Sequence, residues 1–161
     1  MPALPGTALV RVSGQGERVN LYAGQDREAL REAWRTAWRR HLERLPLEPL
    51  QLQMVDLIGM HPEIQVALGA TAPDADRATG GASESTNSFL HLALHLALRE
   101  QLATDRPRGI SAIHRQLCVA SGGIHAAEHR MIEVLAETLW EAQRAGREPS
   151  EQHYVEALRR L

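Results

Sequence analysis

The chain has 161 residues and a formal net charge of -2, with 43% hydrophobic and 24% charged residues. This balance is typical of one ordinary globular domain, and a chain of this length can fold without a disulfide framework or a structural metal. The near-neutral charge gives no electrostatic reason to expect nucleic acid or an anionic membrane as a partner. All 18 basic residues are arginine, which excludes Schiff-base chemistry and a lysine general base.

The first half of the chain predicts a short hairpin and then helices. Residues 8–24 alternate weakly and suit a β-hairpin. Residues 26–45 have the period of an amphipathic helix that begins at Asp26 and is stopped by Pro46. The inward stripe of that helix is expected to hold Leu30, Trp34, Trp38 and Leu45. A second helix is expected over residues 47–60, with the apolar set Leu50, Val55, Leu57 and Ile58.

A short helical turn is expected to start at Pro62, because proline suits the first helical position. Residues 70–86 hold no side chain that could anchor a core, and they predict a mobile loop. Further helices are expected over residues 88–103, 110–120 and 124–145. The last helix opens near Ser150, and its buried side is expected to carry Tyr154, Val155, Leu158 and Leu161.

These elements predict an all-α, bundle-like single domain of five or six helices with a possible N-terminal hairpin. Residues 1–20 are expected to be an extension, and residues 21–161 the helical domain. The single cysteine, Cys118, lies in an apolar segment and is expected to be a buried structural thiol. A lone thiol, together with the lack of a signal peptide or of about 18 consecutive apolar residues, favours a cytoplasmic location.

Two histidine pairs carry the chemical signal. His91 and His95 are the only polar residues between Phe89 and Leu98, and their spacing of four places both imidazoles on one face of a helix. The second pair is in His125-Ala126-Ala127-Glu128-His129, an H-x-x-E-H spacing that one class of zinc hydrolases uses. Two such histidines can converge on one cation, and the glutamate can act as a ligand or as a general base.

Random placement would give this five-residue pattern roughly 0.04 times in a chain of this composition. The spacing alone does not assign the hydrolase class. The competing interpretation is that these are core histidines, hydrogen-bonded to carbonyls and carboxylates and holding two helices in register. His41, His114 and His153 are expected at the surface or its rim. Arg27, Arg31, Arg35 and Arg39 alternate with glutamates and are expected to form a solvated, ion-paired helix face.

From Leu21 to Leu161 the sequence resembles the bacterial family catalogued as domain of unknown function 1841. The resemblance rests on Gly24-Gln25-Asp26-Arg27, His61-Pro62-Glu63, Phe89-Leu90-His91 with His95, Arg99-Glu100-Gln101, Asp105-Arg106-Pro107, and Glu128-His129-Arg130 with Leu135-Ala136-Glu137-Thr138-Leu139-Trp140. It implies a small proteobacterial protein of a family without an established activity. Relatives commonly begin near the position of Leu21, so we expect residues 1–20 to contribute nothing to the site and to pack loosely, or to lie outside the natural product.

Two hypotheses about function follow. The first is a protein with a divalent metal, zinc or iron, in a histidine-rich site between two buried helices, with possible metal-assisted hydrolysis or redox chemistry. Its expected ligands are His91, His95, His125 and His129, with Glu128 as a ligand or base and His61 as an outer candidate. The second is a non-catalytic interaction or regulatory module with structural histidines. The substrate, the partner and any homo-oligomer are left open.

Overall fold

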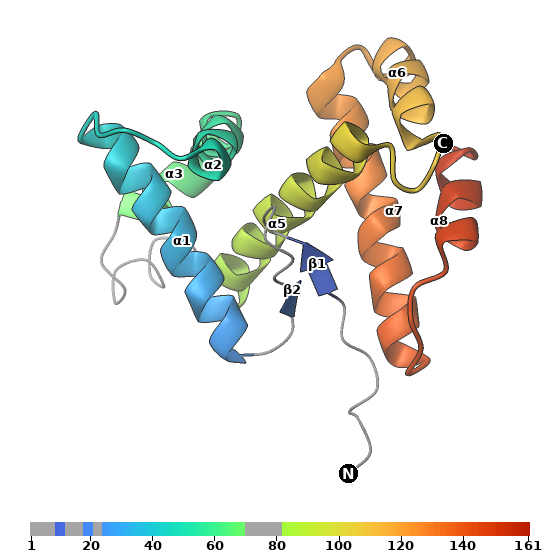
Figure 1. Ribbon diagram of the computed structural model, residues 1–161, viewed down its shortest axis with the longest axis horizontal. Coiled ribbons are helices and arrows are strands. Elements are labelled where there is room, and N and C mark those ends of the chain that lie inside the picture. The colour runs from blue at the N-terminus through green and yellow to red at the C-terminus, as the bar shows by residue number, and fades with distance from the viewer. Residues whose placement is uncertain (1–8, 12–17, 21–23, 70–81) are drawn as a thin grey trace. The chain divides into compact units, whose positions relative to one another are not determined.

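The structure, a computed structural model, describes residues 9–11, 18–20, 24–69 and 82–161 (Figure 1). These residues form seven helices and one two-stranded hairpin, which confirms the expected all-α fold. The chain divides into two compact units, one of residues 23–96 and one that joins residues 1–22 to residues 97–161. In the part of the chain that is described, no helix has the length and apolar character needed to cross a membrane.

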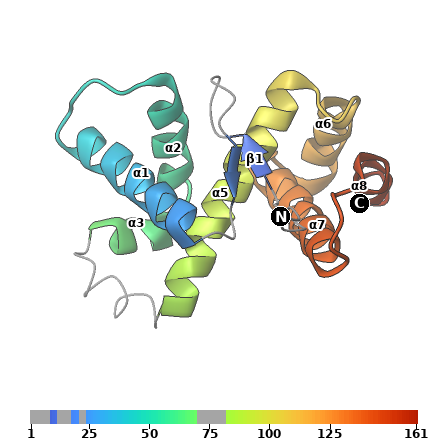
Figure 2. The ribbon, with the colours of Figure 1, turned by 60° about the horizontal axis from the view of Figure 1, so that its bottom comes forward.

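The unit of residues 23–96 is built on α1 (Gly24–Leu42), α2 (Pro49–Gly59) and α3 (Pro62–Gly69), and α1 packs against both α2 and α3 (Figure 2). Helix α5 (Ala82–Thr104) contributes its residues up to Leu96 to this unit. Trp34 of α1, Leu57 of α2 and Leu92 of α5 are fully buried, because the apolar stripe of each helix faces inward.

Helix α2 begins two residues after the expected start at residue 47 and ends one residue before the expected end at residue 60. Pro49 occupies its first turn, and the side-chain oxygen of Gln51 accepts a hydrogen bond from the Glu48 N–H at 3.0 Å. This contact satisfies one of the donors that every helix start leaves open. The C-terminal end of α2 leads directly into His61, one residue before α3 begins. The short turn expected at Pro62 is therefore a complete helix of 8 residues.

The second unit contains the hairpin of β1 (Leu9–Arg11) and β2 (Arg18–Asn20), which pair antiparallel, the end of α5, and three further helices. These are α6 (Ile110–Ser121), α7 (Ile124–Arg144) and α8 (Glu151–Leu158), and α7 packs against both α6 and α8 (Figure 1). Gly122 ends α6 with a φ of 79°, which only glycine adopts easily, and so allows α7 to begin two residues later.

Several boundaries and burial predictions were wrong. Helix α1 begins at Gly24 rather than at Asp26 and ends at Leu42, because Arg44 has a φ of 55° and turns the chain before Pro46. Helix α5 begins at Ala82, inside the segment expected to be a loop, while residues 70–81 lie outside the described part of the chain. Other residues expected in the core are half-buried or exposed: Trp38, Leu45, Leu50, Val55, Cys118, Val155 and Leu161.

Candidate functional site

Three histidines of the unit of residues 23–96 lie in contact. His61 is held between α2 and α3 by its backbone, since its N–H donates to the Ile58 carbonyl at 3.1 Å and its own carbonyl accepts from the Ile64 N–H at 2.9 Å. His91 and His95 occupy successive turns of α5, on the same face, as their spacing predicts. The rings of all three are mutually close, and their centroids are 4.8 to 4.9 Å apart.

This group, which we call the α5 histidine group (His61, His91 and His95), is largely shielded from water. His61 is 1% exposed and His95 is 0% exposed, while His91 is half-buried. The Nε2 atoms of His61 and His91 are 3.0 Å apart. Two nitrogens bound to one tetrahedral zinc ion at 2.0–2.1 Å would be about 3.3 Å apart, so a shift of only about 0.3 Å would suit an ion.

A backbone carbonyl sets the tautomer of His61. Its Nδ1 lies 2.7 Å from the carbonyl oxygen of Leu57 in the last turn of α2. A carbonyl can only accept, so Nδ1 carries the proton, and in the neutral ring Nε2 is left with its lone pair. Metal-ligating histidines commonly make this contact, because it orients the ring and increases its basicity as a ligand. Nε2 of His61 is therefore directed toward His91 in the form that a metal ion requires.

The second group, the α7 histidine group, comprises His125 and His129 in the first two turns of α7. Their ring centroids are 4.2 Å apart with an angle of 58° between the rings, and both side chains are half-buried. Facing nitrogens of this pair lie within 4.8 Å of one another, as do those of His61 and His95. Each group thus presents at least two imidazoles that need little rearrangement to share a cation.

Glu128, the acidic residue of the H-x-x-E-H pattern, is in an ion pair. Its carboxylate oxygen Oε1 lies 3.3 Å from Nε of Arg99, which is on the part of α5 that belongs to the same unit. The Glu128 side chain is 4% exposed and that of Arg99 is 21% exposed. A nearly buried carboxylate needs such a partner, because burial of an unpaired charge is costly.

A thiol and an imidazole meet on α6. The Sγ of Cys118 is 3.4 Å from Nε2 of His114 one turn earlier, and both side chains are half-buried. Burial lowers the pKa of the His114 imidazole, with a smaller opposing effect of the Glu128 charge and a further lowering by Arg115. His114 is therefore neutral at physiological pH. The expectation that Cys118 is buried was wrong, and the spacing of four was the signal that could have linked it to His114.

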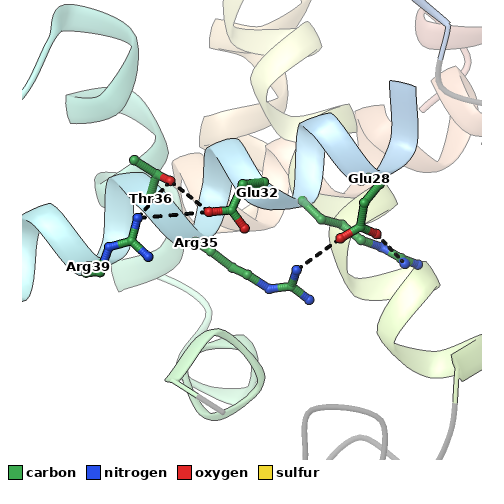
Figure 3. Close-up of polar contacts among 6 residues, drawn as sticks. Glu28, Glu32, Arg35, Thr36 and Arg39 are labelled. Carbon is green, nitrogen blue, oxygen red and sulfur yellow. Dashed lines mark hydrogen bonds and ion pairs between the residues drawn. The ribbon is translucent and has the colours of Figure 1, made fainter. Parts of the chain in front are cut away.

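The arginine stripe of α1 forms the ion pairs that the sequence predicts (Figure 3). Glu28 accepts from Arg31 at 3.5 Å and from Arg35 at 3.2 Å, and Arg39 lies 3.9 Å from Glu32. Arg31 and Arg35 also place their guanidinium groups 5.7 and 5.8 Å from the centre of the Phe89 ring, at the start of the apolar part of α5. The stripe is thus only partly solvated, and it joins α1 to α5.

The expected site residues therefore fall into two groups. His61, which was expected only as an outer candidate, contacts both His91 and His95, and His125 contacts His129. His41 and His153 are exposed, as expected. Imidazole nitrogens suit zinc, copper, nickel and iron, whereas they are poor ligands for magnesium or calcium.

The family model described as Domain of unknown function (DUF1841) matches residues 26–160. No curated protein and no solved structure is significantly similar to the chain.

Proposed function

Since the chain belongs to the DUF1841 family, whose description gives no activity, its own side chains must indicate its role, and we propose that it binds a divalent transition-metal ion through imidazole ligands. The proposed ligands are His61, His91 and His95 in the unit of residues 23–96 and, taken by themselves, His125 and His129 in the other unit. Zinc or iron is the proposed ion, as in the sequence-based hypothesis.

The observation that carries the proposal is the α5 histidine group. Three imidazoles are in mutual contact, and two of them are almost completely buried. Their burial costs more free energy than that of apolar side chains, because each ring has two polar nitrogens that need partners. The Leu57 carbonyl satisfies one nitrogen of His61 and directs the other toward His91. Imidazole nitrogens gathered in this way are suitable ligands for a transition-metal ion.

The type of ligand determines which chemistry a bound ion could support. Neutral imidazoles would leave a bound ion its full positive charge. Zinc held by these histidines would supply Lewis-acid chemistry for hydrolysis, whereas a redox-active ion would supply electron transfer instead. The roles of the chain's own residues are to hold the ion and to exclude bulk water from one side of it, since His61 and His95 are buried.

A second candidate function is favoured by one contact. The hydrogen bond between the Nε2 atoms of His61 and His91 is complete without an ion when His91 carries the proton. In that case the histidines fix the junction of α2 and α3 against α5, and the protein is an interaction or regulatory module.

The test is metal analysis of protein purified without an affinity tag, followed by calorimetric titration of metal-free protein with Zn²⁺ and Fe²⁺. We expect bound metal in the wild type and at least a tenfold weaker Kd in His95→Ala and His129→Ala. His153→Ala is the matched control, because His153 is exposed on α8 and should leave Kd unchanged. Equal Kd values for all three variants, or no binding by the wild type, would refute the metal site and favour the second candidate.

A further inference from the structure

The ion pair of Arg99 and Glu128 has a consequence for which metal the protein would hold. Glu128 lies between His125 and His129 in the sequence of α7, so an unpaired carboxylate there would be a natural oxygen ligand beside two imidazoles. Instead its Oε1 atom is 3.3 Å from Nε of Arg99, with the carboxylate side chain 4% exposed. To coordinate an ion through Oε1, Glu128 would have to give up this charge-assisted contact in a nearly water-free environment, and the same contact orients the rest of the carboxylate.

We propose that Arg99 determines the metal specificity of the protein by holding the Glu128 carboxylate away from the ion, so that the donor set consists of imidazoles alone. This inference rests on the proposed function. Arg99 is thus a specificity-determining residue that acts through Glu128 and does not touch the metal. Glu128, which the sequence suggested as a ligand or base, is a positioning residue in this proposal.

The chemical reason lies in the match of ligand to ion. Mn²⁺ and Fe²⁺ bind weakly to neutral nitrogen ligands and gain most from a hard, negatively charged carboxylate oxygen, as in sites with two histidines and one carboxylate. Ni²⁺, Cu²⁺ and Zn²⁺ bind imidazoles well without one. An all-imidazole set therefore selects these later ions, and of the two metals suggested by the sequence it selects zinc over iron.

A second arginine near Glu128 has other partners. Arg130, two residues after Glu128, donates instead to the Ser121 hydroxyl at 3.2 Å and to the carbonyl of Leu161. It is half-buried on the same helix, and it therefore offers a matched control for the loss of an arginine near the α7 histidine group.

The experiment measures the Kd values of Zn²⁺, Ni²⁺ and Mn²⁺ for metal-free wild type, Arg99→Gln, Glu128→Gln, the double variant and Arg130→Gln. In the wild type we expect Zn²⁺ and Ni²⁺ to bind at least a hundredfold more tightly than Mn²⁺. Arg99→Gln should bring the Kd values of Ni²⁺ and Mn²⁺ at least tenfold closer to each other, because it releases the carboxylate. The double variant should restore the wild-type ratio of these Kd values. Arg130→Gln should leave the ratio unchanged.

Glu128→Gln keeps an oxygen that Arg99 can contact, so it provides a readout if Arg99→Gln does not fold. Its Zn²⁺ Kd should stay within threefold of wild type, and the visible spectrum of its Co²⁺ complex should not change. A tenfold weaker Zn²⁺ Kd, or a changed Co²⁺ spectrum, would overturn the inference by making Glu128 a ligand. A wild-type protein that binds none of the metals would refute the proposed function itself. Binding with the wrong selectivity is a distinct result and would refute only the role of Arg99.

Discussion

The buried ion pair between α5 and α7 gives the most quantitative prediction for stability. Arg99→Met removes the partner of a carboxylate whose side chain is only 4% exposed. Breaking a fully buried pair in this way costs about 3–5 kcal/mol. Because 21% of the Arg99 side chain is exposed, water can reach the site in part, and we expect a value near the lower limit, about 3 kcal/mol.

The double variant Arg99→Met, Glu128→Leu removes both charges and should be more stable than Arg99→Met alone, within about 1 kcal/mol of wild type. A double-mutant cycle that also includes Glu128→Leu alone then gives the coupling energy of the pair. Urea unfolding followed by far-UV circular dichroism measures each free energy, and EDTA must be present so that metal binding does not add to it.

The α1 pair of Arg39 and Glu32 is the matched control. Its atoms are 3.9 Å apart, and its side chains are 58% and 57% exposed (Figure 3). Arg39→Met should therefore cost less than about 0.5 kcal/mol. If Arg99→Met costs as little as Arg39→Met, the contact with Arg99 is too weak to hold Glu128, and Arg99 does not determine metal specificity in the proposed way.

Three further predictions concern the unit that contains α6 to α8. The N–H groups of Ser111 and Gly109 donate to Asp105 and lower the pKa of its carboxyl group below the usual 3.8. The stabilising contribution of Asp105 is therefore present above pH about 4 and is lost as the pH falls through the lower pKa of the folded state. Asp105→Asn should reduce the dependence of Tm on pH between pH 5 and 3, measured by thermal unfolding. Burial raises the pKa of Tyr154, whose hydroxyl donates to Gln101 at 3.0 Å; Tyr154→Phe should cost about 1 kcal/mol at pH 7 and should abolish the loss of stability that wild type shows above pH about 10. Deletion of residues 2–20 should change Tm by less than about 4 °C, the shift that 1 kcal/mol gives a domain of this size; a truncated chain that fails to fold would show that the hairpin is essential to its unit.

The helices were predictable because glycine and proline mark their ends. Pro62, Gly122 and the segment before Glu151 lie where the sequence places helix boundaries. The error at α5 has a physical cause: its first turn is made of Ala, Ser and Glu, which lack the apolar period used to find helices, yet a helix that is already nucleated extends through such residues at little cost. The start at Ala82 was therefore invisible to hydrophobic periodicity.

The burial of apolar side chains was predicted less well, because polar neighbours can cover an apolar side chain that stays at the surface. Trp140 lies on the apolar arc of α7 but is 52% exposed, and the guanidinium of Arg144 lies 4.6 Å from the centre of its ring. A cation over an aromatic face stabilises both groups near the surface. The helical period gives the direction of a side chain, but whether another element covers it depends on tertiary packing.

The candidate site shows the same division between local and long-range information. Spacing alone placed His91 beside His95 and His125 beside His129, because residues four apart share a helix face. No spacing could place His61 against His91, since 30 residues separate them and the contact depends on how the junction of α2 and α3 packs on α5. Nor could it show that the Leu57 carbonyl fixes the proton on Nδ1 of His61. Sequence therefore identifies which residues could bind a metal, whereas the backbone around them determines which nitrogen is available to it.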